Sequence, residues 1–97
     1  MTQGNEWWSF EESLVAGLKP EPGVYELANR EETVIYIGSA SNVRLRLQQR
    51  LREPTGSCIG RHAVFARVEY TAAFKTREQN LRKLFRDVFG ADPLCNT

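Results

Sequence analysis

Two tyrosines lie in short β-rich segments that a turn would bring together. Tyr25 stands in residues 24–27 and Tyr36 in residues 33–37, with the polar residues 28–32 between them. If the two segments pair with Tyr25 opposite Tyr36, both phenols point to the same face of the hairpin. A phenol can accept or relay a proton, and it can also simply pack across two strands. The pair therefore indicates either proton transfer or a stabilised hairpin.

Charged side chains downstream of the tyrosines suit phosphate chemistry. Gly38 lets backbone approach a ligand, and the helix that follows presents free amides and a positive dipole end to an anion. Arg46 and Arg50, spaced i, i+4 on one flank of that helix, can neutralise phosphate oxygens. Glu78 in the first turn of a later helix complements the helix dipole, or takes a metal ion or arginine as partner. Solvated arginines are the alternative interpretation.

The hydrophobic pattern predicts the elements that must position these groups. Ser9 and Glu12 fit a capping box for a first helix that reaches Leu18 and stops before Pro20. The two tyrosine segments then form a hairpin with a loop over residues 29–32. A helix follows that ends before Pro54, and its apolar stripe consists of Val43, Leu47 and Leu51.

The C-terminal half adds one strand and one helix. Alternation predicts a third strand over residues 63–70, and Thr76 and Gln79 fit a second capping box. The helix they open ends at Gly90, and we expect its core-facing residues to be Leu81, Leu84, Phe85 and Val88. The order α-β-β-α-β-α predicts an α+β fold, a small three-stranded antiparallel-type sheet flanked by helices.

Length and composition predict one globular domain over residues 1–97, with a helical extension over 1–21 and a core over 22–96. The chain has 97 residues, of which 41% are apolar and 26% charged, so wholesale disorder is excluded. No apolar run is long enough to span a bilayer, and the N-terminus lacks the basic and apolar regions of a signal peptide. We therefore expect an intracellular, cytoplasmic protein that makes no membrane contact.

Cysteine and histidine content argues against a zinc centre. Cys58 and Cys95 lie far apart and form no CxxC pair, and His62 is the single histidine. A four-ligand zinc site would need additional carboxylates. We expect two free thiols in a reducing compartment.

Charge is distributed unevenly along the chain although the net charge is only +1. Residues 1–40 contain two basic and seven acidic side chains, whereas residues 41–97 contain eleven basic and five acidic ones. Such a division indicates one surface that meets polyanions. Solvated faces of amphipathic helices account for it equally well.

The paired motifs Gly23-Val24-Tyr25 and Tyr36-Ile37-Gly38, followed by residues 39–46, resemble the GIY-YIG nuclease superfamily. Similarity extends over residues 22–96 and is strongest to the N-terminal nuclease domain of bacterial excision-repair endonucleases and to phage intron homing endonucleases. It implies a divalent-metal-dependent endonuclease that hydrolyses DNA phosphodiester bonds with one Mg²⁺ or Mn²⁺ ion. It also implies DNA repair, recombination or mobile elements as the setting.

The resemblance assigns roles to residues of this chain. Tyr25 and Tyr36 line the active site, Arg46 contacts the scissile phosphate and Glu78 binds the metal ion. Tyr25 is the expected proton acceptor, oriented by Tyr36, or else a relay. The expected nucleic-acid-binding residues are Gly38, Ser39, Arg44 and Arg50, and the supporting residues are Gly23 and Asn96.

Three departures from the family pattern stand out. Ser39 replaces a frequent lysine, Arg50 stands where relatives often have histidine or tyrosine, and the stretch from Glu78 to Pro93 is longer. So short a chain leaves little surface for reading sequence. We therefore expect structure-selective or weakly sequence-selective cutting, or a separate recognition domain or protein that supplies the target. The alternative is a non-catalytic nucleic-acid- or protein-binding module that retains the fold.

Overall fold

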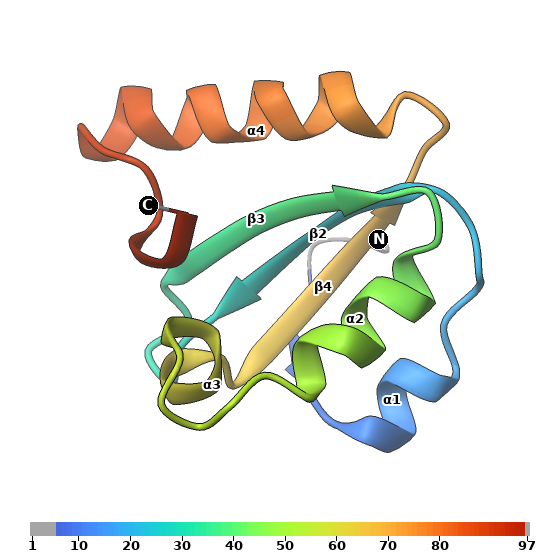
Figure 1. The fold of residues 1–97 in the computed structure, drawn as a ribbon. Helices are drawn as coiled ribbons and strands as arrows, with labels where there is room; N and C mark the ends of the chain where they lie inside the picture. Colours follow the sequence, from blue (N-terminus) through green and yellow to red (C-terminus); the bar gives the residue numbers. More distant parts are fainter. Residues whose placement is uncertain (1–5, 97) are drawn as a thin grey trace.

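A computed structural model describes residues 6–96 (Figure 1). The sheet contains four strands, and helices lie between its strands and after the last one. The elements in chain order are β1 (Trp8–Ser9), α1 (Glu12–Ala16), β2 (Gly23–Ala28), β3 (Val34–Ala40), α2 (Val43–Leu51), α3 (Cys58–His62), β4 (Phe65–Tyr70), α4 (Phe74–Phe89) and the 3-10 helix η2 (Leu94–Asn96).

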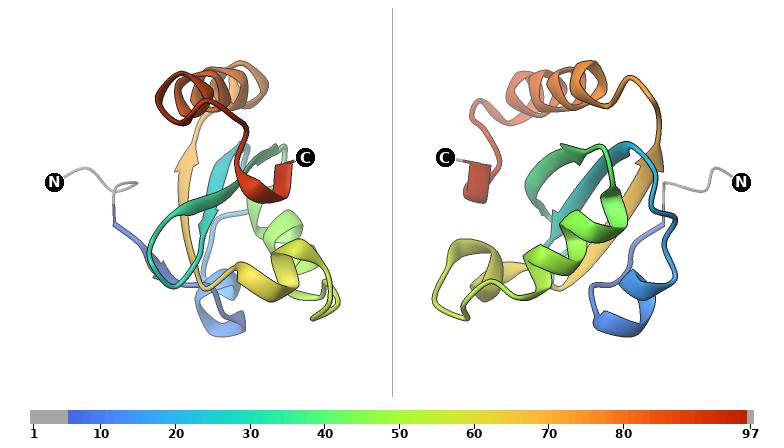
Figure 2. Two further views of the ribbon diagram at one scale, coloured as in Figure 1. Left: turned by 90° about the vertical axis from the view of Figure 1, so that its left-hand side faces the viewer. Right: turned by 45° about the vertical axis from the view of Figure 1, so that its right-hand side comes forward.

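The sheet has the order β1-β4-β2-β3, and every neighbouring pair is antiparallel. Figures 1 and 2 show α1, α2 and α3 grouped on one side of the sheet and α4 on the other. The predicted α+β class is confirmed, but the strand count was wrong because the short strand β1 pairs with β4 through Trp8 and Ser9. The helix α3 was also missed: Ser57, whose hydroxyl accepts from the Gly60 amide, caps it in a stretch for which the sequence predicted no element.

The β2–β3 hairpin is paired two residues away from the predicted register. Tyr25 is opposite Gly38, and Tyr36 is opposite Leu27, with a bulge between Leu27 and Ala28. A shift of two residues preserves the face on which a side chain lies, whereas a shift of one would reverse it. The tyrosines therefore share a face, as predicted, although they are diagonal neighbours.

The two predicted capping boxes are absent. Helix α1 begins at Glu12 without a side-chain cap, because Ser9 is part of β1. Helix α4 begins at Phe74, so Thr76 and Gln79 lie inside it and Glu78 stands beyond its first turn. The expected core stripe of α4 was also wrong in part, since Leu84 and Val88 are 56% and 72% exposed.

The main core lies between the sheet and the helices α1, α2 and α3. The stripe predicted for α2 is confirmed in Val43 and Leu47, which are fully buried, and Leu51 is half-buried. Tyr25 is part of this core, with only 1% of its surface exposed. Its buried members are Val15, Tyr25, Leu27, Ile35, Val43, Leu47, Ile59 and Ala66. Within residues 6–96 no helix is long and apolar enough to cross a membrane.

Cys58 and Cys95 form a disulfide that joins α3 to η2. The expectation of two free thiols is therefore wrong. The cysteines are 37 positions apart, yet their Cα atoms are 5.6 Å apart, within the range that a disulfide spans. Only the docking of η2 beside α3 brings them together, and the sequence pattern contains no signal of that contact.

The disulfide should contribute strongly to stability. Closing a loop of this length is worth about 4 kcal/mol in the chain-entropy model, which corresponds to a melting temperature lower by roughly 15 °C or more in a domain of this size. We expect that drop for the Cys58→Ser/Cys95→Ser variant, and for the wild-type protein in dithiothreitol, in thermal melts followed by circular dichroism. Dithiothreitol should not change the melting temperature of the double variant. If dithiothreitol leaves the melting temperature of the wild-type protein unchanged as well, the disulfide does not contribute to stability.

Candidate active site

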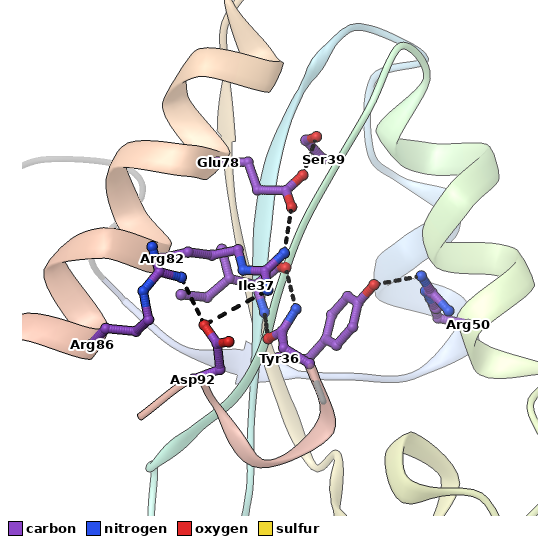
Figure 3. Close-up of polar contacts among 9 residues, drawn as sticks. Tyr36, Ile37, Ser39, Arg50, Glu78, Arg82, Arg86 and Asp92 are labelled. Atoms are coloured by element: carbon purple, nitrogen blue, oxygen red, sulfur yellow. Dashed lines mark hydrogen bonds and ion pairs between the residues drawn. The ribbon is translucent and has the colours of Figure 1, made fainter. Parts of the chain in front are cut away.

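Polar side chains gather on both sides of the edge strand β3. Because β3 is the last strand of the sheet, one of its edges faces away from β2. Side chains alternate between the two faces of a strand, so Tyr36 and Gly38 lie on the α2 side and Ser39 lies on the α4 side. Figure 3 shows Tyr36 pointing to Arg50, and Ser39 meeting Glu78.

The tyrosine cluster comprises Tyr25, Tyr36, Arg50 and Glu53. The phenol rings are stacked with centroids 6.0 Å apart. Arg50 donates from Nε to the Tyr25 hydroxyl at 3.2 Å and from Nη2 to the Tyr36 hydroxyl at 2.8 Å. Its third nitrogen, Nη1, donates to Glu53 at 2.8 Å. Every nitrogen of the guanidinium is therefore engaged, and Arg50 holds both phenols in place.

Gly38 makes room for the two phenols. A Cβ atom at this position would lie 2.6 Å from both Cζ and the hydroxyl of Tyr25 and 2.8 Å from the ring of Tyr36. Any side chain here would displace one of the rings. Gly38 is therefore required for the packing of the two tyrosines. Gly23 has a similar structural role, since its Cβ would lie 2.5 Å from the carbonyl oxygen of Glu69.

The two phenols have different environments. Burial raises the pKa of Tyr25, and the hydrogen bond and charge of Arg50 offset only part of that increase. Tyr36 is half-buried and so keeps access to solvent. Burial alone would lower the pKa of Arg50, but its bonds to Tyr25 and Glu53 outweigh burial and raise it, so the guanidinium stays cationic. Burial therefore disfavours the loss of a proton from Tyr25.

An open pocket of about 270 Å³ lies beside the tyrosine cluster. It is lined by Arg46, Gln49, Arg50 and Glu53, all on or directly after α2. The i, i+4 spacing of Arg46 and Arg50 thus places both guanidiniums on one concave surface, as predicted. Arg44 is half-buried on the same helix and, within residues 6–96, forms no ion pair. The pocket can accept an anionic group next to Tyr36.

The carboxylate cluster lies on the other side of β3. Glu78 accepts a hydrogen bond from Ser39 through Oε1 at 2.5 Å, and its Oε2 lies 3.5 Å from Arg82 Nη1. Asp92 lies 3.6 Å from Arg82 and 2.8 Å from Arg86. The hydrogen bond from Arg86, and then the charges of both arginines, lower the pKa of Asp92. Ser39 therefore contacts a carboxylate on the α4 side of β3.

Asn96 closes the free edge of β3. Its Oδ1 accepts from the Ile37 amide at 2.9 Å, and its Nδ2 donates to the Ile37 carbonyl at 3.0 Å. The side-chain amide thereby satisfies backbone groups that an edge strand leaves unpaired. Ile37 stands between Tyr36 and Gly38, so Asn96 fixes the strand where both clusters meet. The disulfide at Cys95 is the neighbouring anchor.

The donors at Glu78 fit a hydrated divalent cation better than a fully ligated one. Among residues 6–96 no group of three or more His, Cys, Asp or Glu side chains is placed to hold a metal ion. Glu78 offers one carboxylate with 24% side-chain exposure, next to the Ser39 hydroxyl. A single carboxylate among oxygen donors suits Mg²⁺, which keeps most of its water. Glu78 is the residue that would hold such an ion.

Four residues of these clusters were not predicted, namely Arg82, Arg86, Glu53 and Asp92. Arg82 is four positions after Glu78 on α4, and this i, i+4 spacing was a visible signal. Glu53 is likewise three positions after Arg50, at the end of α2. Asp92 had no such signal, because the turn after Gly90 brings it back towards α4.

Comparison with protein families and solved structures now identifies what the fold is similar to. The family model of the UvrC-like GIY-YIG domain matches residues 21–82 of the sequence. The GIY-YIG N-terminal endonuclease domain of UvrC from Thermotoga maritima, bound to its catalytic divalent cation magnesium, superposes with a TM-score of 0.65. It is 24% identical, and the match covers 88% of this chain and 93% of that chain. A point mutant of that domain gives 0.62 at 24% identity, covering 84% and 89%.

Two curated relatives match a shorter stretch. The UvrABC system protein C of Chlorobium phaeobacteroides is 48% identical over 40 residues, which is 41% of this chain. That of Prosthecochloris aestuarii is 40% identical over 42 residues, or 43% of this chain. The match covers only 6% and 7% of these longer proteins. The resemblance found in the paired motifs is confirmed.

Proposed function

Because the chain belongs to the UvrC-like GIY-YIG domain family, we propose that it is a metal-dependent endonuclease that hydrolyses DNA phosphodiester bonds. The observation that carries the proposal is the position of both clusters on one edge strand. Tyr36 meets the cationic Arg50 on the α2 side of β3, and Ser39, three residues later, meets the carboxylate of Glu78. A phosphodiester bound at this edge would lie close to the tyrosine cluster on one face of β3 and to the carboxylate cluster on the other.

Each cluster supplies a different part of the hydrolysis. Glu78 would hold a divalent ion, Mg²⁺ or Mn²⁺, which would supply Lewis-acid stabilisation of the phosphate and of the leaving oxygen. Arg46 neutralises charge that develops on the phosphoryl oxygens, using donors that are already in place. Tyr36 orients the attacking water and accepts or relays its proton. Asn96 keeps β3 fixed between the two clusters.

The structure favours Tyr36 over Tyr25 as the phenol that handles the proton. Ionising a tyrosine of ordinary pKa at neutral pH costs about 4 kcal/mol, and burial raises the pKa of Tyr25 further. Tyr36 is half-buried, accepts a hydrogen bond from Arg50 at 2.8 Å and lies 4.8 Å from the Arg50 guanidinium across its ring. Arg50 thereby holds the Tyr36 hydroxyl in place at the solvent-accessible side of the cluster. Tyr25 then positions Arg50 and fills the core.

The proposed substrate and its biological setting are inferred from the basic side chains of α2 and from the family to which the chain belongs. DNA is the proposed partner, bound by the arginines of α2, which include Arg44 and Arg46. The domain is small, so we propose structure-selective or weakly sequence-selective cleavage in DNA repair, together with a recognition domain or protein partner. The competing function is a binding module without catalysis.

Incubation with labelled flap, branched, nicked and linear DNA tests the proposal directly. In EDTA the protein should bind DNA without cutting it, and the affinity should fall steeply between 50 and 200 mM salt because phosphate contacts release counterions. Addition of Mg²⁺ should start cleavage. Binding without any cleavage in Mg²⁺ or Mn²⁺, on all four substrates, would instead establish the binding module.

A further inference from the structure

Arg82 lies between two carboxylates and forms a short hydrogen bond with neither of them (Figure 3). Its Nη1 is 3.5 Å from Glu78 Oε2, and its Nη2 is 3.6 Å from Asp92 Oδ1. Strong charge-assisted hydrogen bonds are shorter, at about 2.7–2.9 Å. The buried Arg82 Nε has no hydrogen-bond partner within the described part of the chain. Arg82 thus makes one long contact with each of two carboxylates.

Asp92 already has a better partner than Arg82. Arg86 reaches the same oxygen, Oδ1, at 2.8 Å. Two arginines therefore share Asp92, whereas Arg82 is the one cationic partner of Glu78 among residues 6–96. Asp92 can accept a closer contact from Arg82 because a carboxylate has two oxygens and about four lone-pair sites.

A divalent cation at Glu78 would change this balance. Arg82 lies against Oε2, and like charges only a few ångströms apart repel. The guanidinium must move away from Glu78 before an ion uses that oxygen. Asp92 is the second carboxylate that the structure places beside it.

We propose that Arg82 is a movable counter-ion that pairs with Glu78 in the metal-free protein and transfers to Asp92 when a divalent cation binds. It is a positioning residue, because it acts on the cation through Glu78. The inference rests on the proposed function in one respect, the assignment of Glu78 as the metal ligand. Two opposite effects follow. Arg82 weakens metal binding, and Asp92 strengthens it by giving Arg82 another partner.

A purely structural i, i+4 ion pair makes a different prediction. Such a pair on a helix surface contributes little to stability. Its loss would lower thermal stability slightly and leave metal affinity unchanged. Metal affinity in the absence of DNA therefore separates the two roles of Arg82.

The test is a titration with Mn²⁺ alone, followed through paramagnetic broadening of backbone amide NMR signals around Glu78. Arg82→Met should bind Mn²⁺ more tightly, on the order of tenfold for the loss of one adjacent positive charge. Asp92→Asn should bind it several-fold more weakly. Arg82→Lys keeps the charge and should resemble the wild-type protein. Arg82→Gln serves as a second neutral variant if Arg82→Met does not fold.

A double-mutant cycle distinguishes transfer from simple charge effects. Asp92 also attracts a cation over distance, so Asp92→Asn weakens binding somewhat by charge alone. If Arg82 transfers to Asp92, the effect of Asp92→Asn should shrink sharply in the Arg82→Met background. Equal effects in both backgrounds would refute the transfer, and unchanged or weaker binding by Arg82→Met and Arg82→Gln would refute the counter-ion role.

Glu78→Gln separates this inference from the proposed function. The variant should lose the Mn²⁺-dependent broadening around residue 78. If broadening persists there, Glu78 is not the ligand and the proposed metal site fails together with the inference. If broadening is lost but the neutral Arg82 variants match the wild-type protein, the inference alone is overturned.

Discussion

Replacing Glu78 with glutamine is expected to lower the single-turnover rate of DNA cleavage by at least ~10³. The substitution keeps the shape of the side chain and removes the negative charge that holds the cation. Metal ions acting as Lewis acids contribute several kcal/mol of transition-state stabilisation, and each 1.36 kcal/mol is a factor of ten in rate. Ser39 can still donate to the amide oxygen of glutamine, so the fold around β3 should be preserved.

Glu69→Gln is the matched control for this prediction. Glu69 undergoes the same chemical change but forms an exposed ion pair with Arg77, outside both clusters. Its cleavage rate should remain within about twofold of the wild-type rate, because exposed ion pairs contribute little. Thermal melts of both variants establish that they fold. Wild-type cleavage by a folded Glu78→Gln protein in Mg²⁺ would remove Glu78 from the mechanism.

Tyr36→Phe should lower the cleavage rate by on the order of 10²–10⁴, the range for a group that transfers a proton. The ring remains, so its stacking on Tyr25 and its contact with Arg50 persist. Only the hydroxyl that receives the 2.8 Å bond from Arg50 is lost. DNA binding should survive, because the arginines of α2 are unchanged. The measurement is single-turnover cleavage of one saturated substrate.

Tyr25→Phe separates the two phenols. Its hydroxyl is buried and bonded to Arg50 at 3.2 Å, so its loss frees one donor of Arg50 without removing a solvent-facing group. We expect a rate loss below about tenfold, with a modest loss of stability for one buried hydrogen bond. Tyr70→Phe, remote from both clusters and bonded through its hydroxyl to the Lys19 amide, is the control and should cut normally. If Tyr25→Phe lowers the cleavage rate more than Tyr36→Phe does, Tyr25 is the residue that accepts or relays the proton.

We expect no ionisation of Tyr25 to contribute to the pH dependence of cleavage in the neutral range. A raised pKa favours the neutral phenol, so Tyr25 stays protonated throughout the neutral range. The groups that face Tyr36 are Tyr25 from β2 and Arg50 from α2, with Glu53 bonded to Arg50. Arg50 is the cation in this set.

The side chains of the candidate site could largely be named from the sequence because local spacing determines which face they occupy. The paired motifs, with Arg46 at its distance along the following helix, specify residue types and their order. Alternation along a strand placed Tyr25 and Tyr36 on one face, and that survived an error of two residues in register. The stripe of α2 was likewise predictable, since a helix presents every third or fourth residue to the core.

Contacts between distant segments were decided only by the tertiary structure. The capping boxes failed because Ser9 joins a strand and α4 starts at Phe74, so local side-chain caps were overridden by pairing and packing. The Cys58–Cys95 bridge and the bonds from Asn96 to Ile37 depend on where η2 docks, and no periodicity encodes that position. The same holds for Asp92, which meets Arg82 only because the chain turns back after α4. Periodic patterns report which face a residue occupies within its own element, whereas the partner on another element is chosen by the packing of the whole chain.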